Sequence, residues 1–186
     1  MKLHLIRHAE AVDLSATSVD DYRYLSCRGR TRFRRVAETL KKCGIDPEII
    51  ISTPLVRAVQ SAEIVAETLR FSGELLILPL LGDGFCLSRL REFLEERGGV
   101  RELALVGHEP DLGLLVGELL GLTNCGIKKG GVVTLNLKLQ QPETVARFLW
   151  MVTGGGKLIT DHDTAVTRLT GGRDQPTEEY NDSNHQ

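Results

Sequence analysis

Two histidines and two arginines come at the ends of short apolar runs in the sequence, or shortly after them. Arg7 and His8 end the first run, and His108 follows a later run after a single glycine. Arg57 comes shortly after another run, which ends at Ser52. Because ligands of open α/β sheets bind at the carboxyl ends of the parallel strands, these residues are candidates for one common site.

This set of side chains is suited to phosphoryl transfer without a metal or a cofactor. A neutral imidazole attacks phosphorus directly, and cationic donors stabilise the charge that spreads over the equatorial oxygens. An arginine side chain presents a planar fork that grips two oxygens and stays charged at any working pH. The set therefore predicts a histidine nucleophile, with arginines at the phosphoryl oxygens.

The segment Ser52-Thr53-Pro54 is typical of a helix start, with a hydroxyl cap and a proline in the first turn. Such a helix N-terminus supplies backbone N–H donors to a bound phosphate. A capping hydroxyl can face the same phosphate. Ser52 is therefore included among the predicted substrate-binding residues.

Short apolar runs that alternate with amphipathic stretches predict the elements that position these residues. Strands are predicted over residues 2–6, 49–52, 75–78, 103–106 and 132–137. Helices are predicted over residues 30–43, 54–69, 87–96, 111–120 and 142–152. This alternation indicates an α/β sandwich with a largely parallel sheet, whose strands are covered on both faces.

The composition predicts one soluble globular domain over residues 1–170. The chain has 186 residues, of which 41% are hydrophobic and 26% charged, with a net charge of −2. Residues 171–186 are polar and lack periodicity, so we expect a mobile tail there. We expect no nucleic-acid or membrane partner, because the charge balance gives no basic footprint and no run of about 18 apolar residues occurs.

The start of the chain lacks the continuous apolar stretch of a signal peptide, so a cytoplasmic protein is expected. Its four cysteines are scattered and form no CxxC pair, which indicates reduced thiols. The oligomeric state stays open, with a monomer slightly favoured.

Three segments resemble motifs of the histidine phosphatases, also called the phosphoglycerate mutase-like superfamily. LIRHAEA resembles the leading Arg-His motif, STPLVRAVQSAE the motif with the phosphate-binding arginine, and LVGHEPDLG the second-histidine motif. The segments follow the family's order, and the resemblance spreads over residues 2–140. Within the superfamily, RHAEA and GHEPDLG are similar to the SixA-type phosphohistidine phosphatase branch.

The resemblance implies a three-layer α/β/α sandwich with a mostly parallel central sheet. It also implies a phospho-His8 intermediate, with the phosphate held by Arg7, Arg57 and His108. Members of the SixA-type branch remove phosphate from histidine on signalling or phosphotransfer proteins. A phosphohistidine-bearing protein is therefore the substrate that the resemblance implies.

Two positions depart from the family pattern. Ala9 stands where the superfamily usually has glycine, and its methyl group could narrow the approach of the backbone to phosphate. Ser61 replaces a common threonine after Gln60, which we interpret as a small change on a helix surface.

The third departure is the absence of a recognisable acid motif. Mutases and phosphomonoesterases of the superfamily carry a carboxylic acid that protonates an alkoxide leaving group. The loop after the third predicted strand contains Asp83 as its only carboxylate. A phosphohistidine substrate needs less help from an acid, because protonated imidazole is already a good leaving group. Asp83, Glu10 and Glu109 stay open as candidate acids.

Two other functions stay open. The first is a small-molecule phosphomonoesterase that acts on a small phosphate ester with the same nucleophile and one of these acids. The second is a phosphate-sensing module that keeps the pocket without turnover, as a consequence of Ala9.

Other polar clusters favour structural interpretations. His4 is expected to have a partly buried structural role, and Asp161-His162-Asp163 lacks the second cluster that a metal site needs. The basic series from Arg28 to Arg35 is interpreted as a solvated helix face that could contact a phosphorylated partner.

Overall fold

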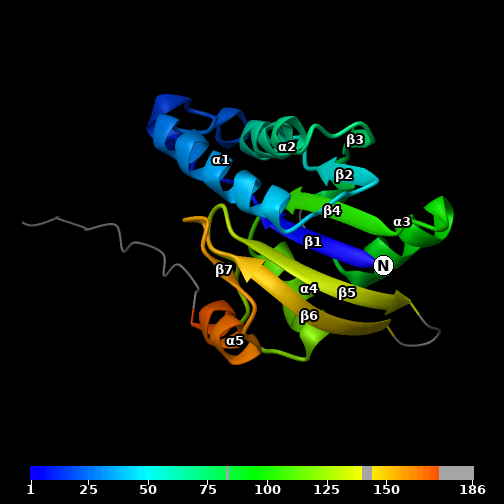
Figure 1. Ribbon diagram of the computed structural model, residues 1–186. Coiled ribbons are helices and arrows are strands. Elements are labelled where there is room, and N and C mark those ends of the chain that lie inside the picture. Colours follow the sequence, from blue (N-terminus) through cyan, green and yellow to red (C-terminus); the bar gives the residue numbers. More distant parts are fainter. Residues whose placement is uncertain (83, 140–143, 172–186) are drawn as a thin grey trace, which may run out of the picture.

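A seven-stranded sheet forms the centre of the computed structural model, which describes residues 1–82, 84–139 and 144–171. The strand order is β3-β2-β4-β1-β5-β6-β7 (Figure 1). The strands are β1 (Lys2–Arg7), β2 (Ile49–Ser52), β3 (Glu74–Ile77), β4 (Glu102–Gly107), β5 (Val132–Leu139), β6 (Thr144–Val152) and β7 (Leu158–Ile159). The first four run parallel to one another, whereas β5, β6 and β7 continue the sheet in antiparallel pairings.

Helices cover both faces of this sheet. The α-helices are α1 (Cys27–Lys42), α2 (Val56–Leu69), α3 (Leu87–Arg97), α4 (Asp111–Leu120) and α5 (His162–Thr170). Of these, α1 and α2 lie on one face, and α4 and α5 lie on the other (Figure 1). The short 3-10 helices are η1 (Leu14–Ala16), η2 (Asp20–Tyr22) and η3 (Pro79–Leu81). The predicted three-layer α/β/α sandwich with a mostly parallel sheet is confirmed.

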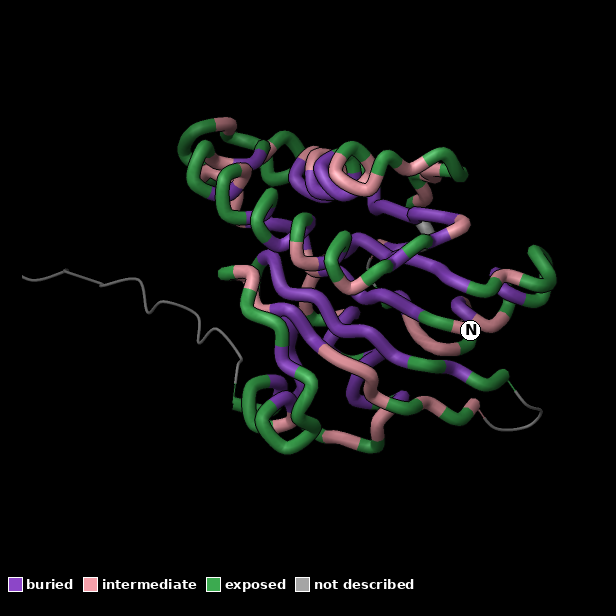
Figure 2. The backbone as a smooth tube through the Cα atoms, viewed as in Figure 1, coloured by how far each residue is buried: buried purple, intermediate pink, exposed green. Residues whose placement is uncertain are grey.

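Strand β1 is buried on both of its faces, which explains its continuous apolar run. Leu3 and Leu5 pack in the core on the α4 side, whereas Ile6 packs with Phe33 of α1. Successive strand residues point to opposite faces, so one short run serves two cores. Figure 2 shows this burial along the central strands, with exposure concentrated on the outer sides of the helices.

The helix predicted over residues 142–152 is wrong. Its described part, Thr144–Val152, is strand β6, which pairs antiparallel with β5. The segment contains valine, phenylalanine and tryptophan, which favour strands. Pairing along β5 also satisfies backbone groups that a helix would have satisfied internally.

Several other boundaries and elements differ from the predictions. Helix α1 begins at Cys27 rather than at residue 30, and strand β5 extends to Leu139 rather than to residue 137. Helix α2 begins at Val56, with Leu55 as its N-cap residue and no side-chain cap, so the predicted cap at Ser52-Thr53 is wrong. Strand β7 and helix α5 lie in a segment for which no element is predicted.

No helix in the described ranges is long and apolar enough to cross a membrane. The four cysteines are free. Gly171, where the predicted tail begins, directly follows α5, and residues 172–186 lie outside the described residues.

Candidate active site

His8 directly follows β1 at the carboxyl edge of the parallel strands. Its backbone N–H donates to the Gly107 carbonyl (3.1 Å), and its carbonyl accepts from the Gly130 N–H (2.9 Å). The ring Nδ1 lies 2.7 Å from the Ala9 carbonyl oxygen. Because a carbonyl oxygen only accepts, Nδ1 carries the proton, which leaves the lone pair of a neutral ring on Nε2.

The surroundings of His8 keep its imidazole neutral. Burial lowers the pKa of His8 to about 3, and the charges of His108, Arg57 and Arg7 act in the same direction against the hydrogen bond from Nδ1. The ring is therefore neutral at neutral pH, with its single N–H proton on Nδ1. A neutral, oriented imidazole beside cationic groups is the form that attacks phosphorus.

His108 directly follows β4 and lies beside His8. The two ring centroids are 4.9 Å apart, with an angle of 49° between the ring planes. Nε2 of His108 is 2.6 Å from Oγ1 of Thr53, which follows β2. Three neighbouring strands, β1, β4 and β2, thus bring these side chains together.

Arg7, the last residue of β1, is anchored to the segment that precedes β5. Its Nη1 donates to the Ile127 carbonyl (2.7 Å), and its backbone N–H donates to the Gly131 carbonyl (3.0 Å). This segment enters the site because β5 runs antiparallel to β1 and begins at the same sheet edge. The backbone therefore fixes where the Arg7 guanidinium lies.

Arg57 lies in the first turn of α2 and is 8% exposed. Its Nη1 donates to the Asp20 carbonyl (2.8 Å) and its Nη2 to a carboxylate oxygen of the same residue (2.7 Å). Partial burial raises the pKa of Asp20, but hydrogen bonds from Arg23 and Arg57 lower it below its usual value overall. Asp20, for which no role is predicted, is therefore a charged partner of the predicted phosphate-binding arginine.

The structure brings Thr53, rather than Ser52, to the histidines. Ser52 is fully buried, and its hydroxyl donates to the Thr53 carbonyl (2.9 Å). The Thr53 hydroxyl reaches His108. Alternation along an extended chain points successive side chains to opposite faces, so Ser52 and Thr53 are not expected to face the same site.

Ser61 is not on the helix surface, and that interpretation is wrong. It is fully buried; its hydroxyl donates to the Arg57 carbonyl (2.7 Å) and accepts from the Ala9 N–H (3.1 Å). Ser61 thus connects the residue after His8 to the helix turn that carries Arg57. Its position four residues after Arg57, on the same helix face, is the signal that could have found it.

Two of the three candidate acids, Glu10 and Glu109, lie in the described residues, and each is engaged with other groups. Asp83 lies outside the described residues. Glu10 is directed toward α1, where its carboxylate lies 3.9 Å from Arg28 and 3.9 Å from Arg32.

Glu109 lies behind the site and supports its backbone. One carboxylate oxygen of Glu109 accepts from the Ile127 N–H (2.9 Å). The carbonyl oxygen of Ile127 in turn accepts from Arg7. Burial raises the pKa of Glu109 to about 7, although the Ile127 hydrogen bond and the Arg7 charge oppose the shift. Glu109 is therefore placed to hold the segment that holds Arg7.

His4 is a buried structural residue. Its Nδ1 lies 2.8 Å from Thr134 Oγ1, and its Nε2 lies 2.9 Å from Glu102. Asp161 caps α5 by accepting from the Thr164 N–H (2.9 Å). Within the described ranges, no group of three or more histidines, cysteines or acids is arranged to hold a metal ion.

Comparison with known proteins assigns this constellation to a family. The model of the histidine phosphatase superfamily (branch 1) matches residues 3–81. The phosphohistidine phosphatase SixA of Escherichia coli (strain K12) is 32% identical over 122 residues, which cover 64% of this chain and 74% of that protein. The chain belongs to the histidine phosphatase superfamily. As a histidine phosphatase, it is a hydrolase of phosphorylated compounds.

Other proteins similar to this histidine phosphatase have names that indicate different substrates. An uncharacterized protein of Picosynechococcus sp. is 35% identical over 145 residues, covering 73% of this chain and 84% of that protein. A structure of the protein histidine phosphatase SixA with tungstate has a TM-score of 0.71 at 25% identity, covering 83% of this chain and 97% of that one. The alpha-ribazole phosphatase of Shigella flexneri shares the fold, with a TM-score of 0.60 at 18% identity and coverage of 80% and 95%.

Proposed function

We propose that this histidine phosphatase removes phosphate from phosphohistidine side chains of a protein through a covalent intermediate on His8. The proposed chemistry is supported by the neutral imidazole of His8 and the cationic groups beside it. The choice of a protein substrate is carried by one observation, the exposed apolar side chains on the segment whose Asp20 binds Arg57.

In the first step, Nε2 of His8 attacks phosphorus, so a new N–P bond forms while the N–P bond of the substrate breaks. The substrate imidazole takes the electron pair of that bond and leaves as a neutral ring, because its other nitrogen already carries a proton. Arg7, Arg57 and His108 contact the oxygens of the transferring group, where the charge spreads.

In the second step, water attacks the phosphorus of phospho-His8. The N–P bond breaks, its electron pair returns to Nε2, and both protons of the water stay on the released phosphate. The hydrogen bond from Nδ1 of His8 to the Ala9 carbonyl oxygen holds the imidazole ring in one orientation through both steps.

The carboxylates described around the site are engaged with other groups. Asp20 is bound to Arg57, Glu10 lies toward Arg28, and Glu109 is bound to the backbone of Ile127. An alkoxide leaving group needs a proton donor within hydrogen-bond reach. A phosphohistidine whose ring already carries a proton leaves as a neutral imidazole without such a donor, so the described carboxylates are compatible with an N–P substrate.

Exposed apolar side chains on the segment that contacts Arg57 support a protein as the phosphohistidine carrier. They are Leu14, Val19, Tyr22 and Tyr24, which are 50%, 45%, 64% and 45% exposed. The segment that carries them is held at the site, because Asp20 binds Arg57. Exposed clusters of aromatic and aliphatic side chains mark protein interaction sites.

The basic face of α1 adds a charge preference. Arg28 and Arg32 reach Glu10 only at 3.9 Å, and both are largely exposed. Such exposed cations steer an acidic partner toward the site. We therefore propose a partner with acidic residues around its phosphohistidine.

Hydrolysis of a small phosphate ester is the second candidate, because the fold is shared with the alpha-ribazole phosphatase of Shigella flexneri. Asp83 would then supply the proton to the leaving oxygen. A phosphate-sensing module without turnover is the third candidate. It is suggested by Ala9, which is 2% exposed and follows His8 at a position where the superfamily usually has glycine.

The test is a rate panel with purified protein. Substrates are a protein phosphorylated on histidine, free phosphohistidine, and several phosphomonoesters. We expect the phosphoprotein to have the highest kcat/KM, and brief incubation to leave acid-labile label that is absent from His8→Ala. Faster turnover of an ester that requires Asp83 would replace the proposal with the second candidate. Tungstate binding without any hydrolysis would replace it with the third.

A further inference from the structure

A cavity of about 270 Å³ lies beside the candidate active site and has no part in the proposed reaction. It opens between α5, the segment that precedes β5, and the end of β6, and its lining includes Gly126, Gly131 and Met151. Gly131 in its wall accepts the backbone hydrogen bond of Arg7, the residue before His8. The cavity therefore adjoins the backbone that carries candidate site residues.

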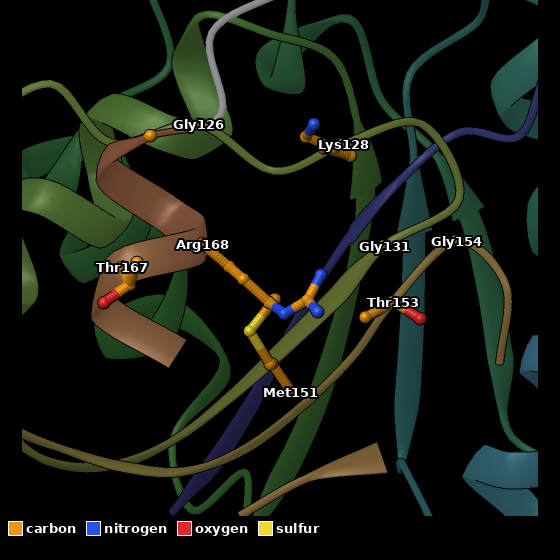
Figure 3. Close-up of a pocket in the computed structure, with 9 residues that line it drawn as sticks. Gly126, Lys128, Gly131, Met151, Thr153, Gly154, Thr167 and Arg168 are labelled. Atoms are coloured by element: carbon orange, nitrogen blue, oxygen red, sulfur yellow. The ribbon is translucent and has the colours of Figure 1, made fainter. Parts of the chain in front are cut away.

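Two cationic side chains line the cavity. Figure 3 shows Arg168 reaching from α5 across Met151 toward Thr153, with Lys128 on the opposite wall. No acidic residue is among the described residues that line it. Over the described ranges, no salt bridge includes Lys128 or Arg168.

The position of Arg168 has an ordinary structural component. It lies in the last turn of α5, where a cation interacts favourably with the helix dipole. That interaction does not explain Lys128, which belongs to a different segment and faces the same space. Lys128 and Arg168 are both exposed, so their charges are accessible to an anion that enters the cavity.

The shape of the lining favours an anion with an apolar stem. Met151 is 6% exposed and forms an apolar part of the lining next to Arg168 (Figure 3). The methylene groups of a glutamate side chain would cover this apolar part while its carboxylate meets Lys128 and Arg168. A bare phosphate ion would leave the apolar part uncovered.

We propose that the cavity is a second anion subsite, which takes a carboxylate of the phosphoprotein while the phosphohistidine lies at His8. This inference rests on the proposed function and adds a specificity element to it. The subsite acts on recognition, so it changes KM and leaves kcat unchanged.

The test uses two synthetic phosphohistidine peptides that differ only in whether the residues beside the phosphohistidine are Glu or Gln. The variant is Lys128→Ala/Arg168→Ala in the full chain. The matched control is Lys138→Ala/Arg147→Ala, which removes two exposed cations from β5 and β6 outside the cavity. Thermal unfolding of both variants checks the fold.

We expect wild-type kcat/KM to be about three- to tenfold higher for the Glu peptide, as two partly exposed ion pairs allow. That preference disappears in the cavity variant and persists in the control. An equal preference in wild type and cavity variant overturns the subsite. Loss of preference in the control as well shows an effect of net charge and also overturns it. If wild type hydrolyses neither peptide, the proposed function fails, and the subsite fails with it.

Discussion

Nε2 of His108 lies 2.6 Å from Oγ1 of Thr53, so the residue after β2 orients the second histidine of the site. Removing this hydroxyl with Thr53→Val should let the imidazole turn away from the phosphoryl group. We expect kcat/KM to fall about three- to tenfold, the usual effect of one hydrogen bond. Steady-state kinetics on the phosphoprotein measures it. Thr53→Ser keeps the hydroxyl and should retain most activity. Equal rates for Thr53→Val and the wild type would show that Thr53 does not orient His108.

Asp20 and a bound phosphate both present negative charge to the Arg57 guanidinium. Neutralising the carboxylate with Asp20→Asn should therefore strengthen tungstate binding about threefold, in the range of an exposed ion pair. Inhibition constants for tungstate measure the effect. Asp21→Asn, on the exposed neighbouring residue, is the control and should change nothing. Weaker binding by Asp20→Asn would mean that Asp20 orders Arg57 for phosphate.

The depressed pKa of His8 makes stability depend on pH in a defined window. Its pKa is about 3 in the folded protein and 6.5 as the ordinary value, so the unfolded chain binds the extra proton between these limits. The free energy of unfolding should therefore fall as the pH falls from about 6.5 to about 3. Between pH 7 and pH 5 the loss from His8 is roughly 1–2 kcal/mol.

Urea unfolding at these two pH values tests this window. His8→Gln lacks the titrating group and should lose less stability on acidification than the wild type. Other groups contribute equally to both proteins and cancel in the difference. An identical loss in the two proteins would show that His8 titrates near its ordinary pKa in the folded state.

Glu109 should give the opposite pH dependence. Its folded pKa is about 7 and its ordinary value is 4.5, so the folded chain keeps a proton that the unfolded chain has lost. The stability that this proton provides is present below about pH 4.5 and is lost as the pH rises to about 7. Unfolding at pH 5 and pH 7.5 should show a smaller loss for Glu109→Gln than for the wild type.

Activity separates the structural role of Glu109 from its charge. Gln keeps an oxygen that accepts from the Ile127 N–H, so Glu109→Gln should retain kcat. Glu109→Ala removes the support of Ile127 and, through it, of Arg7, so its kcat should fall about three- to tenfold. Equal rates for the Ala and Gln variants would exclude this positioning role.

The strands that carry the histidines could be predicted because β1 and β4 are short apolar runs that end in polar residues. Alternation of such runs with helices determines where the carboxyl edge lies, so the meeting of His8 and His108 follows from local signals. The assignment of β6 failed because its partner β5 decides its conformation, and that pairing is not visible in the local pattern.

The contacts among site residues were harder to predict. Asp20 and Arg57 are separated by 37 positions, and their contact depends on the path of the segment between β1 and α1. The spacing of Ser61 from Arg57 indicates a shared helix face, but its hydrogen bond from the Ala9 N–H depends on how α2 packs against the residue after β1. The single domain over residues 1–170 stays a prediction.

Strand β5 runs antiparallel to β1, so the chain enters β5 at the edge of the sheet where His8 lies and leaves it at the opposite edge. The two ends of this strand therefore differ in their distance from the chemistry. Changes at Lys128 would alter substrate choice without touching the strand that carries the nucleophile. The far end of β5, at Leu139, is remote from the chemistry, so a label attached there should not reduce catalysis.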